Sequence, residues 1–226
     1  LAERGRAIAE DLEVLTSELR QSGTTPFGTL RMTASASFGR QYLSPLLPGF
    51  LARYPRIRAD WLFDNRQVDL IAENFDAAIG GGIELAPGVI SRPLAPLHII
   101  AVASPAYLKG RTLPIDPSGL AAFDGIVMRA ARTGLVRRWT MRNAGGSEVD
   151  AQLPGTIVFN DPSAMCRAAL LGLGVTLIAV PDALHHLESG ALVRVVPQWY
   201  ADAGSISVYY ATRALLPAKT SAFVDF

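Results

Sequence analysis

The sequence predicts an α/β fold built from βαβ units around a parallel sheet, and three observations lead to this prediction. Segments in which apolar residues alternate with period two are followed by segments with helical spacing, and this order repeats along the chain. The 226 residues allow one large domain or two small lobes, at roughly 150 residues per domain. Half of the residues are hydrophobic and 18% are charged, as is typical of a folded globular protein.

Residues 1–21 predict a solvent-exposed helix with one apolar seam. Ile8, Leu12, Leu15 and Leu19 are four, three and four residues apart, with charged residues between them. This narrow stripe favours pairing with another chain, although packing on the helix's own domain is the alternative. Residues 22–26 then end the helix as a linker. Because residue 1 falls inside a charged helical pattern, we expect the chain to be a fragment.

Alternating and helical patterns then follow one another through the first half of the chain. A strand is expected at 28–35, a helix at 37–54, a strand at 57–63, a short helix at 68–71 and a strand at 77–80. Glycines 80–82 close the last of these strands, where a backbone could approach a ligand closely.

The second half of the chain repeats this alternation of strands and helices. The expected strands are 97–103, 125–128, 139–141, 156–159, 175–180, 192–196 and 206–212. Helices are expected to begin at Pro105, Pro162, Pro181 and Pro217, because proline suits the first turn of a helix. Asp161 precedes the second of them and can cap its free amides.

Charge and composition exclude several functional classes. Lys and Arg number 21 against 20 Asp and Glu, so the net charge of +1 provides no basic field for nucleic acid or anionic lipid. Cys166 is the only cysteine, so an internal disulfide is excluded, and three histidines make a Cys/His zinc site unexpected. The richest apolar stretch, 170–180, is too short to cross a bilayer. We expect a soluble protein with no membrane partner and no metal.

Signatures of catalysis are absent from the sequence. It contains no G-x-S-x-G elbow, P-loop, dinucleotide fingerprint or H-E-x-x-H motif, so neither an enzyme nor a cofactor is expected. His185 and His186 are adjacent and point about a hundred degrees apart on a helix, which favours a surface or capping role over metal binding. Cys166 is expected to be a small buried residue rather than a reactive thiol.

Three places where a strand ends predict a pocket for a small ligand. Ser35–Phe38 and Asn160–Asp161 each join a strand end to a helix start, where free amides favour an anion, and Gly80–Gly82 ends a third strand. In open parallel sheets, ligands bind outside the carboxyl ends of the strands. The alternative is that Ser37 and Asp161 only cap their helices.

Many segments, in order, resemble the effector-binding region of LysR-type transcriptional regulators over nearly the whole chain. These segments are residues 1–21, 28–32, 37–40, 46–55, 69–70, 75–79, 102–108, 160–161 and 171–175. The Phe-Gly-Arg and Val-Ala-Ser-Pro segments look like the branch related to the regulator CrgA.

The resemblance implies a specific architecture. It implies two Rossmann-like lobes joined by two crossing strands near Ala101 and Ser207, like the type 2 periplasmic binding proteins, preceded by a linker helix at 1–23. Lobe I would comprise residues 24–100 and 207–226, and lobe II residues 101–206. A winged helix-turn-helix would precede the chain and bind DNA.

The resemblance also implies partners and site residues. A small effector would lie between the lobes of a cytoplasmic bacterial regulator, contacted by Ser35, Ser37, Phe38, Gly81, Ala103, Asn160 and Asp161. The protein would form dimers or tetramers, in which the helix from Tyr42 to Arg53 packs beside the Pro162–Leu171 helix of the partner. The residues expected at that interface are Tyr42, Leu46, Phe50, Arg53, Met165 and Ala169.

Two other functional classes compete with this interpretation, and one residue departs from the pattern of the family. The competitors are an extracytoplasmic solute receptor of a transporter, which shares the fold, and an enzyme that uses Asp161 with a neighbouring serine. The departure is Gly80, where relatives of this branch often carry an arginine that could pair with a carboxylate. We therefore expect a neutral, aromatic or weakly anionic effector.

Overall fold

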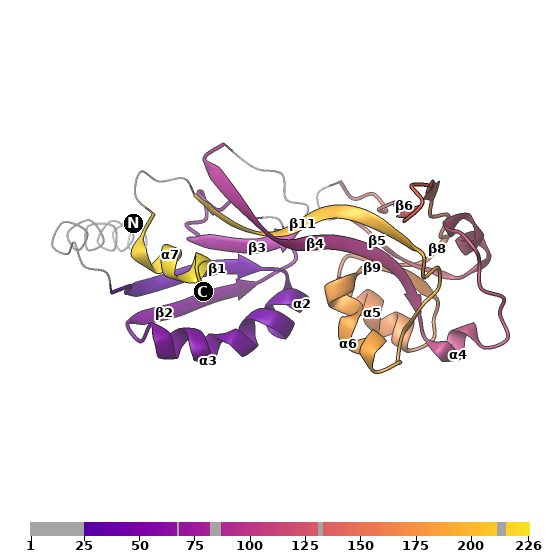
Figure 1. The fold of residues 1–226 in the computed structure, drawn as a ribbon, viewed down its shortest axis with the longest axis horizontal. Coiled ribbons are helices and arrows are strands. Elements are labelled where there is room, and N and C mark those ends of the chain that lie inside the picture. Colours follow the sequence, from indigo (N-terminus) through magenta and orange to yellow (C-terminus); the bar gives the residue numbers. More distant parts are fainter. Residues whose placement is uncertain (1–24, 67, 82–86, 131–132, 212–215) are drawn as a thin grey trace.

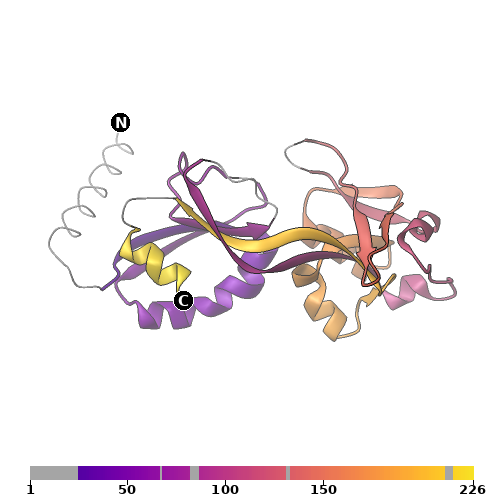
Figure 2. The same ribbon diagram turned by 45° about the horizontal axis from the view of Figure 1, so that its top comes forward.

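The protein is elongated, with two lobes joined by two long strands (Figures 1 and 2). The computed structural model describes residues 25–66, 68–81, 87–130, 133–211 and 216–226. The helix predicted over residues 1–21 lies outside these described residues. Gly82, at the end of the predicted third strand, lies outside them as well. No helix in the described part of the chain is both long and apolar enough to cross a membrane.

Each expected strand has a counterpart and two are longer than expected, while the strand at 148–150 was not predicted. They are β1 (Gly28–Ala34), β2 (Ile57–Phe63), β3 (Ala77–Gly81), β4 (Val89–Ala103), β5 (Gly125–Met128), β6 (Thr140–Asn143), β7 (Glu148–Asp150), β8 (Gly155–Phe159), β9 (Val175–Ala179), β10 (Val193–Arg194) and β11 (Trp199–Ala211). The long strands β4 and β11 connect the lobes.

Helical segments alternate with these strands. They are α2 (Ala36–Phe38), the π-helical η1 (Gly39–Leu43), α3 (Ser44–Arg53), α4 (Pro105–Leu108), the 3-10 helix η2 (Pro117–Ala122), α5 (Pro162–Leu170), α6 (Val180–Glu188) and α7 (Ala218–Val224). The helix expected at 37–54 is therefore present, but it passes through a π-helical turn.

One mixed sheet runs through both lobes in the order β2-β1-β3-β11-β4-β9-β5-β8. In lobe I, β1 is parallel to β2 and β3, and in lobe II, β5 is parallel to β8 and β9. Strand β11 is antiparallel to β3 and β4, and β4 is antiparallel to β9. The two-lobed α/β prediction is confirmed, while the sheet is mixed rather than wholly parallel.

The passage of β11 from one lobe to the other coincides with a bulge. The register with β4 shifts between Asp202 and Ser205, where Gly204 has a φ of 84°. Glycine adopts this left-handed conformation without steric cost, and the Asp202 carboxylate accepts the Gly204 N–H at 2.9 Å. The bulge lets one strand pair with both halves of the sheet.

Each lobe has its own hydrophobic core. In lobe I, Leu30 of β1 and Phe50 of α3 pack with Ala222 of α7, so the C-terminal end of the chain completes the first lobe. In lobe II, α5 and α6 cover one face of the sheet, where Met165 and Ile126 belong to one buried cluster. The other face of that sheet carries a separate buried cluster.

The short helix predicted at 68–71 is wrong. The Asp69 carboxylate accepts the N–H groups of Ile71 and Ala72, both at 3.0 Å, and forms a capped turn. Asn74 then adopts a φ of 56°, which leaves the right-handed helical region. A residue in that conformation ends the turn before a helix can continue.

Candidate functional site

The carboxyl ends of the parallel strands in both lobes face the junction between the lobes. In lobe I, β1 and β3 run in the same direction, so Ser35, which follows β1, and Gly81, the last residue of β3, lie at one edge. In lobe II, β5 and β8 run in the same direction, and Asn160 and Asp161 follow β8. The start of α2 in lobe I thus faces the start of α5 in lobe II across the junction.

Asn65 joins these two helix starts, although the sequence analysis gave it no role. Its side-chain oxygen accepts the Ala36 N–H at 3.1 Å, and its amide nitrogen donates to Asp161 Oδ1 at 2.8 Å. Ala36 begins α2 in lobe I, and Asp161 caps α5 in lobe II. One exposed amide therefore bridges the lobes where an effector is expected.

Asp161 carries out the capping role that the sequence predicted. Its carboxylate accepts the N–H groups of Ser163 at 3.3 Å and Ala164 at 3.1 Å. The same carboxylate accepts the bond from Asn65. Capping and the contact between lobes thus depend on one side chain, so movement of α5 would change both.

A second set of contacts joins the lobes along their helices. Arg40 Nη2 donates to Ser163 Oγ at 3.2 Å. The Tyr42 hydroxyl donates to the Pro181 carbonyl at 2.8 Å. The Ser37 side chain lies near the Asp182 carboxyl at the start of α6 and acts to lower its pKa. The beginning of the lobe I helix therefore lies against both α5 and α6.

Asp182 is an acidic group held at this junction. Burial raises the pKa of its carboxyl, the nearby Ser37 side chain lowers the pKa, and the charge of Asp161 raises it again. The net direction is upward, because burial disfavours the charged form. Nearby, burial also raises the pKa of the Cys166 thiol, to about 11.

A cavity of about 360 Å³ opens between the lobes on this helical side. Its lining residues come from the start of the lobe I helix and from α5 and α6: Ser37, Arg40, Gln41, Ser163, Cys166, Arg167, Leu170, Asp182 and His186. Burial lowers the pKa of His186, and the neighbouring His185 lowers it further. The described residues contain no group of three or more His, Cys, Asp or Glu side chains that could hold a metal ion.

The predicted effector contacts divide into three groups. Ser35, Asn160 and Asp161 follow strand ends at the junction and Gly81 ends β3 there, whereas Ser37 lies near α6. The Phe38 ring packs on Tyr42, with 4.9 Å between the ring centroids, and joins the lobe I core.

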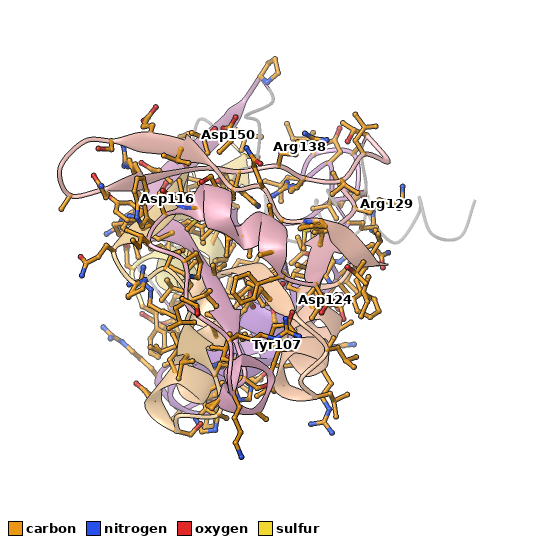
Figure 3. The ribbon with its side chains drawn as sticks, turned by 90° about the vertical axis from the view of Figure 1, so that its right-hand side faces the viewer. Tyr107, Asp116, Asp124, Arg129, Arg138 and Asp150 are labelled. Carbon is orange, nitrogen blue, oxygen red and sulfur yellow. The ribbon has the colours of Figure 1, made fainter. Side chains whose placement is uncertain are left out.

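Ala103 is a wrong prediction. It is fully buried in the lobe II core and pairs with Val193 of β10. Because β4 is antiparallel to β9, its carboxyl end lies at the opposite edge of the sheet from the ends of β5 and β8. Figure 3 looks onto that outer end of the lobe, where Tyr107 of α4 donates a hydrogen bond to Asp124 at 2.9 Å.

Three predicted interface residues are also wrong. Phe50 and Met165 are 1% exposed and Ala169 is fully buried, so none of them has surface left for a partner chain. Each packs inside its own lobe, because the inward face of an amphipathic helix fills the core. Leu46 and Arg53 are exposed and Tyr42 is half-buried.

Comparison with known proteins supplies the family. The model of the LysR substrate binding domain matches residues 23–226. An HTH-type transcriptional regulator of Xanthomonas campestris pv. campestris is 31% identical over 99% of this chain. The HTH-type transcriptional regulator DmlR of Escherichia coli is 30% identical over 99% of this chain and 72% of its own length. The chain spans 65% of the length of the Xanthomonas relative.

Solved structures show the same fold. CrgA, a LysR-type transcriptional regulator from Neisseria meningitidis, aligns with 99% of this chain and 75% of its own, with a TM-score of 0.77 and 20% identity. The regulatory domain of the C227S variant of AphB from Vibrio vulnificus aligns with 88% of this chain and 96% of its own, with a TM-score of 0.73 and 25% identity. These relatives do not favour the alternative of a transporter's solute receptor.

Proposed function

The chain belongs to the LysR substrate-binding domain family, and from this premise we propose that a small effector binds between the strand ends of its two lobes. The chain is the effector-binding domain of a LysR-type regulator. For the whole protein, we propose DNA binding through an N-terminal winged helix-turn-helix outside this chain, and a cytoplasmic location. The relatives' description as HTH-type transcriptional regulators supports both proposals.

The observation that carries the site is the Asn65 bridge. The N–H of Ala36 and the carboxylate of Asp161 meet on one amide, although they belong to different lobes. A ligand with a donor and an acceptor could replace Asn65 at both groups or bind beside it. Such a ligand would favour one relative orientation of the lobes over others, which is sufficient for regulation by a shift in populations.

We place the lobe boundaries at residues 100/101 and 206/207 and expect the effector contacts to be Ser35, Ser37, Phe38, Gly81, Asn160 and Asp161. The pairing of β4 and β11 across the junction supports this division. The module would bind its effector without catalysis, in keeping with relatives that are named as regulators.

The effector would be neutral, aromatic or weakly anionic. Gly80 supports this choice, because a glycine beside the strand end supplies no guanidinium for a second carboxylate. Helix starts and hydroxyl groups would then hold the polar part of the ligand.

Association of two or four copies would carry the effector signal to DNA. The helix containing Tyr42, Leu46 and Arg53 would pack beside α5 of a partner chain. The exposure of Leu46 and Arg53 supports this arrangement, and so does the exposed Leu171 at the end of α5.

The test is a calorimetric panel of neutral, aromatic, monocarboxylate and dicarboxylate metabolites. We expect at least one compound from the first three classes to bind, and Ser35→Ala and Asn160→Ala each to weaken that compound about tenfold, because a hydrogen bond to the ligand is lost. Gln152→Ala, at an exposed amide of lobe II, is the matched control. Binding of dicarboxylates alone would contradict the effector class, and unchanged affinity in both variants would contradict the site.

A further inference from the structure

The cavity on the helical side of the junction extends away from the strand ends where the effector is proposed to bind, and Ser37 is the residue that both regions share. Its lobe II wall follows α5 away from the sheet edge, through Cys166, Arg167 and Leu170. Its lobe I wall is formed by Ser37 of α2 and by Arg40 and Gln41 of the π-helical turn that follows directly. A ligand in the cavity would therefore contact the helices of both lobes rather than the strand ends.

Two guanidinium groups from different lobes line this cavity. Arg40 donates only to the neutral Ser163 hydroxyl among the described residues, at 3.2 Å. Neither Arg40 nor Arg167 forms an ion pair with another described residue, and both are exposed. Arginine forks bind carboxylates through paired charge-assisted hydrogen bonds, so these two residues offer donors that no carboxylate in the described part of the chain takes up.

The remaining charge in the lining does not cancel these two arginines. Among the residues that line the cavity, Asp182 is the acidic one, against the two arginines. Burial raises the pKa of Asp182 and lowers the pKa of His186, so both groups shift toward their neutral forms. With two arginines against one carboxyl, the lining carries a formal positive charge.

The inner surface of the cavity is apolar. The buried Cys166 and the half-buried Leu170 lie on successive turns of α5 and both line it. A volume of about 360 Å³ lies within the range of small-molecule sites, which typically combine an apolar lining with a few polar groups.

We propose that this cavity is a second ligand site, which takes a small organic monocarboxylate with a compact apolar body. The carboxylate would lie between Arg40 and Arg167, and the apolar body would pack on Leu170. Because one arginine belongs to each lobe, the bound ligand would tie the lobes together. This site shares Ser37 with the proposed effector site, but its two arginines take no part in that site, so variants of the arginines and of Asn160 distinguish the two sites.

Isothermal titration calorimetry of the 226-residue chain with cyclohexanecarboxylate tests the proposal. We expect saturable binding with one site per chain, and at least tenfold weaker binding of the neutral cyclohexanecarboxamide, because the amide cannot form the charge-assisted bonds. Arg40→Gln and Arg167→Gln should each weaken carboxylate binding about tenfold or more. The matched control is Arg138→Gln, which removes an exposed arginine on lobe II (Figure 3) and should change the affinity less than twofold.

Specific outcomes would overturn the proposal. One is the absence of saturable binding, and another is equal affinity for the acid and the amide. A third is unchanged affinity in both arginine variants while Asn160→Ala abolishes binding, which would assign the carboxylate to the strand ends. Arg40→Lys and Arg167→Lys keep the charge, so an intermediate affinity in variants with an unchanged melting temperature would support the site even if a Gln variant folds poorly.

Discussion

At the scale of single residues, burial decides the chemistry of Cys166. Its thiol lies in the lobe II core near the carbonyl of Asp182. Burial raises the pKa of this thiol from 9.0 to about 11, and the charge of Asp182 acts in the same direction. The prediction of a small buried residue rather than a reactive thiol agrees with this environment, because the thiolate is the reactive form.

We expect Cys166 to react with a thiol reagent at pH 8 at least about a hundredfold more slowly in the folded protein than in the unfolded chain. A rise of 2 pKa units lowers the thiolate fraction by about that factor, and burial slows access further. Because Cys166 is the only cysteine, the rate of release of the coloured thiol from Ellman's reagent reports it directly. Equal rates with and without denaturant would show that the thiol is accessible.

At the scale of elements, the π-helical turn η1 depends on the absence of a side chain at Gly39. The Ser44 N–H bonds to the Gly39 carbonyl, which closes the wide turn, and the Ser44 hydroxyl donates to the same carbonyl at 3.0 Å. A Cβ atom at Gly39 would lie 2.3 Å from Phe63 Cδ1 of β2. The glycine thus lets the start of the lobe I helix approach the sheet.

Gly39→Ala should therefore lower the free energy of unfolding, by about 1–3 kcal/mol, because the methyl group overpacks the contact with Phe63. Gly49→Ala is the matched control, since its Cβ would meet only Phe226 at 3.7 Å in the exposed part of α3. Alanine there should stabilise the protein, by about 0.5–1 kcal/mol, through helix propensity. Urea denaturation measures both changes, and the same sign for both variants would refute the packing argument.

Local sequence patterns predicted most of the helices and strands, but not whether paired strands run parallel or antiparallel. Alternation identified β1 and β2, and the Asp161-Pro162 pair identified the start of α5, because those signals depend on neighbours in sequence. The antiparallel direction of β4 depends on its long-range pairing with β9, and it removes Ala103 from the site. Asn65 carried no local signal either, because its role comes from the approach of two helix starts that are far apart in sequence.

At the scale of the whole molecule, the C-terminal helix α7 packs on lobe I and stabilises it through Lys219. Lys219 of α7 donates to the Thr29 carbonyl at 2.6 Å and to Asp76 Oδ2 at 2.8 Å. The side chains of this ion pair are only 17% and 10% exposed. Asp76 also accepts the Arg31 N–H at 2.9 Å, so the pair connects α7 with β1 and the start of β3.

Lys219→Met should lower the free energy of unfolding by about 3 kcal/mol, because it leaves the Asp76 carboxylate largely buried without its cation. Arg92→Met is the control, since its ion pair with Asp225 spans 3.2 Å at the surface and should contribute less than about 1 kcal/mol. Chemical denaturation of both variants gives the comparison. Equal losses of the free energy of unfolding in the two variants would mean that the buried ion pair does not hold the C-terminal helix.

The exposed surface of the molecule also predicts where two copies of the chain associate. The inward face of α3 is filled by Phe50, so the side that a partner could meet carries Leu46, which is 53% exposed. Leu46→Glu should weaken self-association about tenfold or more, because burying a leucine side chain contributes about 1.5–3 kcal/mol. Leu113→Glu, at an exposed position of lobe II, should leave association unchanged. Sedimentation velocity measures both variants, and loss of the dimer only with Leu113→Glu would move the interface away from α3.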